Sequence, residues 1–350
     1  MLAEHTFQHS ESFPLESGES LPGFQLFYTT FGTLNVRRDN VIWVCHALTG
    51  NANLLDWWSG LFGEDKLYNP ADYFVICANM LGSCYGSTGP LSVNPQTNQP
   101  FFHSFPAITN RDVVQAFDLL RQELEIGQIH TLIGGSMGGQ QALEWSIMQP
   151  DVVRNLIQIA SNAQHSPWGI AFNESQRMAI ESDASWLENR PDAGLDGMRT
   201  ARSIALLSYR HYRTYQKTQQ DATSDQLTNY RASSYQRYQG EKLARRFNAF
   251  SYWVLSRAMD SHHVGRGRDS VISALKRVKA RTLQVGIGTD VLFPPNEQQF
   301  LAQHIAGSQL AVIYSDYGHD GFLLEYSQLR YHITSFYQEE NTSTKVSEAN

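Results

Sequence analysis

Glycines surround a single serine near the middle of the chain, in residues 134–139 (GGSMGG). A serine at the centre of a G-x-S-x-G pattern is typical of a strand that turns sharply into a helix and presents a nucleophilic hydroxyl. The flanking residues agree, because the apolar residues 131–133 precede the serine and the helix-forming residues 140–145 follow it. Glycine neighbours lack Cβ atoms, so the hydroxyl can stand clear of a tight, strained turn. The pattern predicts that Ser136 is a catalytic nucleophile, although a glycine-rich turn with an incidental serine is the alternative.

A serine hydroxyl needs a base to take its proton and an acid to orient that base. In α/β proteins with this kind of turn, the groups follow the chain order Ser, then Asp or Glu, then His. Asp290 follows the apolar run 282–287. His319 follows the next apolar run, 309–314. Because functional groups gather at the carboxyl ends of parallel strands, we predict that Asp290 and His319 complete a triad with Ser136.

Other titratable residues are weaker candidates for the same roles. Asp316 and Glu297 are competing acids, and His319 is one of 12 histidines, most of which are expected to be surface residues. His262 and His263 are adjacent, but neighbouring histidines rarely share one ion, and no cysteine or carboxylate spacing supports a metal site. The sequence therefore predicts a triad enzyme without a metal.

Acyl chemistry at a serine also requires N–H groups that bind the oxyanion. One should come from Met137, the residue after the nucleophile, and another from the loop that follows an earlier strand. That loop is 46–50, and Leu48 is its expected donor. The helix that begins after Ser136 adds the positive end of its dipole.

The composition limits the class of protein and its partners. The chain has 350 residues, 41% hydrophobic and 17% charged, which is ordinary for a folded protein with a sizeable core. A net charge of −7 predicts no binding of nucleic acid or of an anionic membrane. No apolar run reaches the roughly 18 residues of a membrane span, and the N-terminus lacks the apolar segment of a secretory signal. Three cysteines are too few for a disulfide framework, so we expect free thiols and a cytoplasmic location.

Helical and strand patterns divide the chain into segments. Continuous apolar runs typical of buried strands occur at 41–46, 73–79, 130–133, 155–160, 282–287 and 309–314. They predict an α/β fold with a mostly parallel sheet, formed by residues 1–163 and 279–337, in which residues 1–21 are irregular. Residues 164–278 have helical periodicity without strand runs, which predicts an inserted all-helical lid. Residues 338–350 are polar and are expected to be a disordered tail.

Together these segments resemble one family, the homoserine O-acetyltransferases of the α/β-hydrolase fold, which act in methionine biosynthesis. The resemblance covers about residues 20–335 and rests on the segments 46–50, 82–90, 105–109, 134–145, 290–295 and 318–321, and in the lid on 201–202, 208–210, 238–240 and 265–268.

The resemblance implies a ping-pong acyl transfer. Ser136 would attack the thioester of acetyl-CoA, with His319 as base and Asp290 orienting it, and homoserine would then attack the acyl-enzyme. It implies acetyl-CoA as a co-substrate, no permanently bound cofactor, and a homodimer formed through the lid.

The resemblance also implies the residues that hold the amino acid. They are Arg202 and Tyr209 in the lid, Asp320 after the histidine, and Asn51 near the oxyanion loop. The residue chemistry agrees, because Arg202 can bind a carboxylate through two N–H bonds and Asp320 can accept an ammonium. From spacing alone, Arg202 could instead belong to a solvated basic face, and Asp320 could cap a helix.

Three positions depart from the family pattern, and several activities stay open. Gln140 stands where we expect methionine and could touch the acyl pocket, whereas Phe250 and His263 replace asparagine and an acid in the lid or dimer surface. The same site could use succinyl-CoA or acylate serine. A carboxylester hydrolase has the same triad, and a non-catalytic binder is the third class. A long helical lid favours a dry tunnel, and therefore transfer over hydrolysis.

Overall fold

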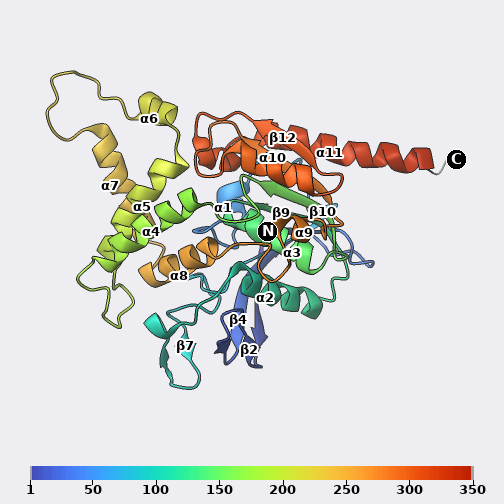
Figure 1. Cartoon of the computed structure of the whole chain (residues 1–350), viewed down its shortest axis with the longest axis horizontal. Helices are drawn as coiled ribbons and strands as arrows, with labels where there is room; N and C mark the ends of the chain where they lie inside the picture. The colour runs from blue at the N-terminus through green and yellow to red at the C-terminus, as the bar shows by residue number, and fades with distance from the viewer. Residues whose placement is uncertain (1, 348–350) are drawn as a thin grey trace.

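The computed structural model describes residues 2–347, without the side chains of 340–347. Its centre is an eight-stranded sheet in the order β1-β4-β6-β5-β9-β10-β11-β12 (Figure 1). Every neighbouring pair from β6 to β12 is parallel, whereas β4 pairs antiparallel with both β1 and β6. The predicted mostly parallel α/β sheet is thus confirmed. The strands of this sheet are β1 (Ala3–His9), β4 (Phe24–Phe31), β5 (Val41–Cys45), β6 (Phe74–Ala78), β9 (Ile129–Gly135), β10 (Val153–Ile159), β11 (Arg281–Ile287) and β12 (Gln309–Ile313).

The central strands are buried on both faces, which explains their continuous apolar runs. Successive side chains of a strand point to opposite faces. In β5, Trp43 therefore packs in one hydrophobic cluster with Phe117 and Trp145, while Val44 packs in the other with Trp58 and Phe336. The first cluster lies under the helices α2 (Asn110–Glu123) and α3 (Met137–Met148), and the second under α1 (Leu55–Trp58) and α11 (Tyr326–Ser347).

The helices of residues 164–278, called the lid below, are inserted between β10 and β11. α4 packs on α5 and α8, and α5 packs on α7, so most of the lid forms one helical layer beside the sheet (Figure 1). The lid helices are α4 (Pro167–Glu181), α5 (Leu195–Tyr209), α6 (Tyr212–Thr218), α7 (Arg231–Ala244), α8 (Ala249–Asp260) and α9 (Val271–Leu275). The remaining elements are β2 (Phe13–Pro14), β3 (Ser20–Leu21), β7 (Val93–Asn94), β8 (Gln99–Pro100), α10 (Pro295–His304) and the 3-10 helices η1 (Phe102–Ser104) and η2 (Gly318–Leu323).

A buried ion-pair network fastens the end of the lid to α3. The Glu144 carboxylate is only 1% exposed, and it accepts hydrogen bonds from Arg111 (2.9 Å) and from Arg268. Arg111 also pairs with the carboxylate of Glu16 (2.7 Å), and Arg266 pairs with Glu16 as well (2.8 Å). The motif GRGR at 265–268 therefore ties the lid's return segment to the core.

The N-terminal segment of the chain differs from the sequence-based expectation. Residues 1–21 were predicted to be irregular, but β1 pairs along its whole length with β4. Its side chains are mostly exposed, so backbone pairing forms this strand without a hydrophobic pattern. A disordered tail was predicted for 338–350; the backbone of α11 continues to Ser347, and the disorder of this tail stays a prediction. Residues 348–350 lie outside the described residues.

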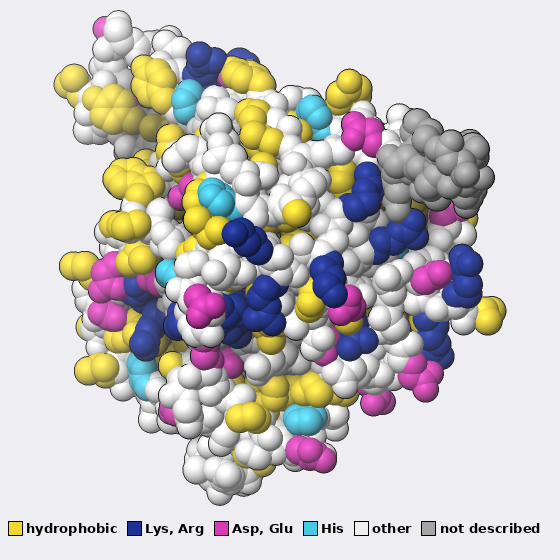
Figure 2. Space-filling model, turned by 45° about the vertical axis from the view of Figure 1, so that its right-hand side comes forward, with side chains coloured by type: hydrophobic (Ala, Val, Ile, Leu, Met, Phe, Trp, Pro, Cys, Tyr) yellow, Lys and Arg dark blue, Asp and Glu magenta, His cyan; other side chains and the backbone are white. Residues whose placement is uncertain are grey.

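The surface carries a mixture of charges. On the face that Figure 2 shows, Lys and Arg side chains are interspersed with Asp and Glu. Ion pairs between distant segments accompany this mixture, such as Lys279 with Asp151 (2.8 Å). Across residues 2–347 we find no helix that combines the length and the apolar character needed to cross a bilayer.

Candidate active site

Ser136 occupies the sharp turn between β9 and α3, so the predicted strand–turn–helix is confirmed. Its backbone has φ 57° and ψ −128°, a conformation that a residue with a side chain adopts only under strain. The Ser136 N–H donates to Ile159 O (3.0 Å), and its carbonyl accepts from Ser161 Oγ (2.8 Å). These bonds from β10 and the segment after it hold the strained turn in place.

The start of α3 lies directly against the end of β5. A Cβ atom built on Gly138 would stand 2.1 Å from the Cys45 carbonyl oxygen, closer than any side chain allows. Gly138 is therefore required for this approach, which brings the oxyanion loop at 46–50 beside Met137.

The predicted acid and base are paired. His319 Nδ1 donates to Asp290 Oδ2 at 2.7 Å, and both side chains are buried. The other oxygen, Asp290 Oδ1, accepts from the N–H groups of Leu292 (2.8 Å) and Phe293 (2.9 Å). The carboxylate is thus held on three sides, and Nε2 of His319 is left as the basic nitrogen.

Aromatic packing brings His319 to the serine turn. The imidazole stacks on Phe293 at a centroid distance of 5.1 Å and meets the edge of Phe322 at 5.3 Å. Phe322 also fills the space beside Gly135, where a Cβ would lie 2.6 Å from its ring. Phe322 therefore touches both the residue before Ser136 and the base. In the described part of the chain, Ser136 Oγ and His319 Nε2 do not form a hydrogen bond.

The electrostatics identify Asp290 as the partner of the base. Burial lowers the pKa of His319, but the charge and hydrogen bond of Asp290, with the charge of Asp320, raise it above its usual 6.5. The competing acid Asp316 is engaged elsewhere, with Lys217 (2.7 Å) and Tyr314 (2.6 Å).

Glu297, the other competing acid, is in a different environment. Burial, together with the nearby charge of Asp290, raises the pKa of Glu297 to about 7, although the neighbouring amide of Asn162 opposes that shift. Glu297 therefore interacts with the acid of the pair and not with the imidazole.

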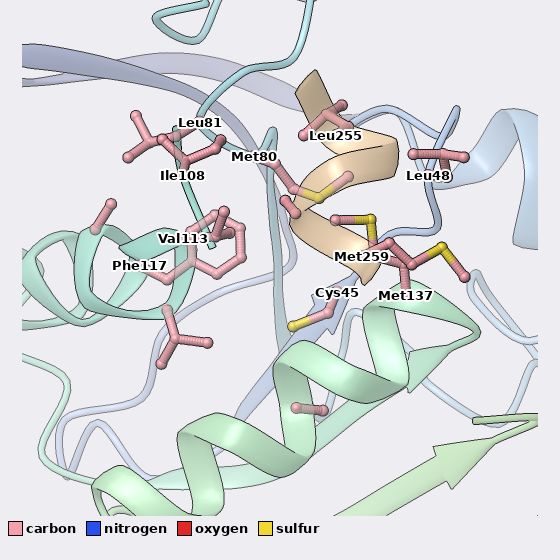
Figure 3. Close-up of a cluster of buried hydrophobic side chains, with 14 of the residues drawn as sticks. Cys45, Leu48, Met80, Leu81, Ile108, Val113, Phe117, Met137, Leu255 and Met259 are labelled. Atoms are coloured by element: carbon pink, nitrogen blue, oxygen red, sulfur yellow. The ribbon is translucent and has the colours of Figure 1, made fainter. Parts of the chain in front are cut away.

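The two predicted oxyanion donors are free to act. A turn closed by Gly50 N–H and Ala47 O (2.8 Å) carries Leu48. In residues 2–347 neither the Leu48 nor the Met137 N–H donates a hydrogen bond. Their side chains lie in one buried apolar cluster with Met259 of α8 (Figure 3).

His46 braces the base of this turn. Its Nδ1 bonds to Ala47 O (2.9 Å), so its Nε2 accepts from Met80 N–H (3.3 Å). Burial lowers the pKa of His46 to about 4, so the ring is neutral at physiological pH and serves as structural support.

Three of the predicted substrate-binding residues gather beside the base. The Arg202 guanidinium lies 5.4 Å from the Tyr209 ring centroid, and that ring lies 5.8 Å from the imidazole of His319. Gly318, with φ +64°, lets the loop of His319 and Asp320 approach the C-terminal end of α5, since a Cβ there would stand 2.9 Å from His211 N.

Sequence reasoning missed one partner in this group. Arg210 Nε lies 2.6 Å from Asp320 Oδ2, so Asp320 is already paired with a lid arginine. The tyrosine–arginine pair 209–210 was part of the family pattern, but only the fold shows which acid Arg210 meets. Neighbouring arginines are also paired, as Arg199 is with Glu241 (2.7 Å), so this surface is not a simple solvated basic face.

Asn51 has a structural contact of its own. Its Oδ1 accepts from Asn53 N–H (2.9 Å), and its carbonyl accepts from Trp57 Nε1 (3.0 Å). These bonds shape the chain just after the oxyanion turn, and a contact of Asn51 with substrate stays a prediction.

The residues that depart from the family pattern have separate environments. Gln140 is fully buried, and its amide bonds to Asn110 (3.2 Å) and Asn162 (3.0 Å), so it belongs to a polar network behind the turn. Phe250 packs inside the lid on Trp186, with ring centroids 5.0 Å apart. The His263 carbonyl accepts from Arg111.

The adjacent histidines do not form part of a ligand cluster. His262 Nε2 bonds to the Asn162 carbonyl (3.1 Å), and burial lowers its pKa to about 3. Within the described residues, no group of three His, Cys, Asp or Glu side chains could hold a metal ion.

The sheet has the topology of the α/β-hydrolase class. A serine at a strained strand–helix turn, followed by an aspartate and a histidine after later strands, is the arrangement of reactive residues in that class. A family model described as alpha/beta hydrolase fold matches residues 40–326. The chain is 52% identical over 340 residues to a homoserine O-acetyltransferase of Cyclobacterium marinum, covering 97% of both chains. It is 44% identical to a homoserine O-acetyltransferase of Chlorobaculum tepidum, covering 91% of this chain and 90% of that one. The chain belongs to the homoserine O-acetyltransferase family.

Solved structures share the fold. A homoserine O-acetyltransferase of Staphylococcus aureus superposes with a TM-score of 0.79 at 29% identity, covering 97% of this chain and 96% of that one. Esterase E22 superposes with a TM-score of 0.88 at 23% identity, covering 96% of this chain and all (100%) of that one. Because an esterase and an acetyltransferase share it, the fold alone does not decide the reaction.

The close approach of α3 to β5 predicts that Gly138→Ala destabilises the protein. The added methyl group would overlap the Cys45 carbonyl, and overpacking of this kind costs about 3 kcal/mol of the free energy of unfolding. Gly127→Ala is the control, because nothing lies within 4 Å of its Cβ position. Urea unfolding of the two variants measures the difference, and equal stabilities would contradict the packing argument.

The paired carboxylate predicts the pH dependence of serine acylation. Since the neutral imidazole is the base, acylation by an activated ester should rise with pH through the raised pKa of His319, above 6.5. Asp290→Asn removes the charge that raises this pKa, so the acidic limb should move to lower pH while the maximal rate falls about 10⁴-fold. Asp316→Asn should leave both unchanged. If the acidic limb moves in Asp316→Asn and not in Asp290→Asn, the orienting carboxylate is Asp316 and the assignment to Asp290 is wrong.

Proposed function

We propose that this protein transfers an acetyl group from acetyl-CoA to the hydroxyl of L-homoserine, a step of methionine biosynthesis, through an acyl-Ser136 intermediate. One observation carries the proposal. The imidazole of His319 bonds to Asp290, and three residues that suit an amino acid lie beside it: Arg202, Tyr209 and Asp320. A triad alone suits any acyl transfer, but a guanidinium and a carboxylate beside it suit an amino-acid acceptor. The names of the relatives support the same acceptor.

In the first half-reaction, Ser136 Oγ attacks the thioester carbonyl while its proton passes to His319 Nε2. The negative charge on the carbonyl oxygen is stabilised by the N–H groups of Leu48 and Met137. The C–S bond then breaks, and the proton on His319 goes to the sulfur, so that CoA leaves as a thiol. Asp290 stabilises the imidazolium that forms between these steps.

In the second half-reaction, homoserine occupies the space beside the base. Arg202 binds its carboxylate, and Asp320 accepts a hydrogen bond from its ammonium, with Tyr209 closing the site. The homoserine hydroxyl gives its proton to His319 Nε2 and attacks the acyl carbon. The bond to Ser136 Oγ breaks, and the proton returns to the serine.

The surroundings of the oxyanion donors favour acetyl over succinyl. The side chains clustered with Leu48 and Met137 are apolar, among them Leu255 and Met259 (Figure 3). A succinyl group ends in a carboxylate, and such a charge is costly to bury against apolar side chains.

A carboxylester hydrolase is the second candidate, because esterase E22 has the same fold. Hydrolysis requires water to reach the acyl-enzyme. Ser136 is only 5% exposed and His319 only 3%, which favours transfer.

The assembly and location are part of the proposal. Apolar side chains exposed on the lid, among them Leu207 (58%), Tyr212 (71%) and Tyr238 (59%), support a homodimer formed through the lid, which sedimentation of the whole chain would measure. The free cysteines Cys45 and Cys77 suit a reducing cytoplasm. The small-molecule substrates are homoserine and acetyl-CoA, and no resident cofactor or metal is required by this chemistry.

A thiol-release assay tests the function directly. It crosses acetyl-CoA and succinyl-CoA with homoserine, serine and water as acceptors. We expect the fastest release with acetyl-CoA and homoserine, and Ser136→Ala should abolish it because the nucleophile is lost. Equal rates with and without homoserine would identify a hydrolase, and unchanged turnover in Ser136→Ala would exclude the acyl-serine route.

The acceptor site has its own test. Arg202→Ala should raise the KM for homoserine about tenfold to a hundredfold, since a charge-assisted bond contributes about 1.5–3 kcal/mol. The rate of CoA release in the first half-reaction should not change. Arg213→Ala is the control, as its exposed side chain bonds to Tyr314. If both half-reactions of Arg202→Ala slow equally, the residue does not bind the acceptor.

A further inference from the structure

A lid arginine reaches the turn that carries the Leu48 oxyanion donor. Arg246 lies between α7 and α8, and its Nη1 donates to the Thr49 carbonyl (2.7 Å) and to Tyr85 Oη (2.7 Å). The two hydrogens of one guanidinium nitrogen thus join the lid, the oxyanion turn and the loop after β6.

The bond to Thr49 acts on a peptide group that is already held from its other side. The Thr49 carbonyl and the Gly50 N–H belong to one planar peptide unit, and the Gly50 N–H donates to Ala47 O (2.8 Å). With Arg246 on the carbonyl, this unit is hydrogen-bonded at both ends. Its orientation sets the dihedral angles of the turn and hence the direction of the Leu48 N–H.

The other supports of this loop lie on either side of the turn's tip. His46 bonds to Ala47 O (2.9 Å) on one side, and Asn79 Oδ1 accepts from Ala52 N–H (2.7 Å) on the other. The His46 bond holds the Ala47–Leu48 peptide unit from the core, and Arg246 holds the Thr49–Gly50 unit from the lid, so the two ends of the turn that carries the Leu48 N–H have separate supports.

Arg246 comes from a well-held piece of backbone. Its N–H donates to Leu243 O (3.0 Å), and its neighbour Phe247 is buried and packs edge-on against Tyr85 with centroids 5.7 Å apart. The preceding residue, Arg245, extends into solvent, and its side chain pairs with the half-buried Glu241 at 3.5 Å. Of these two adjacent arginines, Arg246 contacts the oxyanion turn and Tyr85, whereas Arg245 pairs with Glu241.

We propose that Arg246 is a positioning residue that sets the Leu48 N–H for the oxyanion, so that the lid completes the oxyanion hole. This inference rests on the acyl-serine chemistry proposed above. Both half-reactions pass through a tetrahedral oxyanion at the same N–H groups, so loss of Arg246 slows both. Substrate binding in the ground state does not use these groups and stays unchanged.

The experiment compares Arg246→Ala and Arg246→Lys with Arg245→Ala in the full-length protein. Displacement of a catalytic group by about 1 Å costs on the order of a hundredfold in rate, so we expect Arg246→Ala to lower kcat about tenfold to a hundredfold. Acetylation of Ser136 by p-nitrophenyl acetate should fall by the same factor. KM for homoserine and acetyl-CoA, and the melting temperature, should match Arg245→Ala. Arg246→Lys should recover part of the rate, because an ammonium can still donate to the Thr49 carbonyl.

A second readout separates positioning from a general structural role. A boronic acid forms a tetrahedral adduct with the nucleophilic serine and places an oxygen in the oxyanion hole. Its inhibition constant should rise in Arg246→Ala by about the same factor by which kcat falls, with little change in Arg245→Ala. Tyr85→Phe, which removes one partner of Arg246, should cause a smaller loss of the same kind.

Three results would overturn the inference. The first is equal kinetics of Arg246→Ala and Arg245→Ala. The second is a loss confined to KM for acetyl-CoA with unchanged acetylation by p-nitrophenyl acetate, which would make Arg246 a contact for the phosphates of CoA. The third is a fall in kcat without any change in boronic acid binding. If the wild-type protein reacts with p-nitrophenyl acetate but not with acetyl-CoA and homoserine, the proposed function is wrong. The rates of acetylation by p-nitrophenyl acetate in the Arg246 variants then still test the positioning role of Arg246.

Discussion

The whole site depends on one close approach, that of the first turn of α3 to the end of β5. Gly138 allows it, because a Cβ there would lie 2.1 Å from the Cys45 carbonyl oxygen. The approach sets the Met137 N–H and the turn of Leu48 on the same side of the serine. The strain at Ser136, with φ 57°, persists because β10 and Ser161 hold the turn from behind. Backbone packing, more than side-chain choice, therefore builds this half of the site.

The lid contributes to both halves of the site. The C-terminal end of α5 lies against the loop of His319 and Asp320, where Gly318 leaves room for it. Arg246 lies against the oxyanion turn on the other side. An inserted helical layer that contacts both the base and the oxyanion turn can exclude water and order the catalytic groups at once. Esterase E22 superposes on 96% of this chain, so the helical layer alone does not separate transfer from hydrolysis.

Charged side chains of both signs surround the imidazole of His319. Asp290 and Asp320 both raise the pKa of His319 against the effect of burial. Arg210 pairs with Asp320, and Arg202 lies over Tyr209, so two guanidinium groups lie near the two carboxylates. An amino acid entering here would add one charge of each sign and leave the balance unchanged.

The sequence by itself determined the strands, the turn and the chain order of the reactive residues. Continuous apolar runs mark strands buried on both faces, and glycines around Ser136 mark a turn without room for side chains, since both signals are local. The sequence favoured Asp290 over Asp316 and Glu297 as the partner of His319, and the tertiary structure shows that Asp290 makes this contact. The tertiary structure also revealed β1, which depends on pairing with β4, the pairing of Arg210 with Asp320, and the burial of Gln140 in a polar network. Local patterns record how deeply a residue is buried, but contacts between distant segments depend on how the whole chain packs.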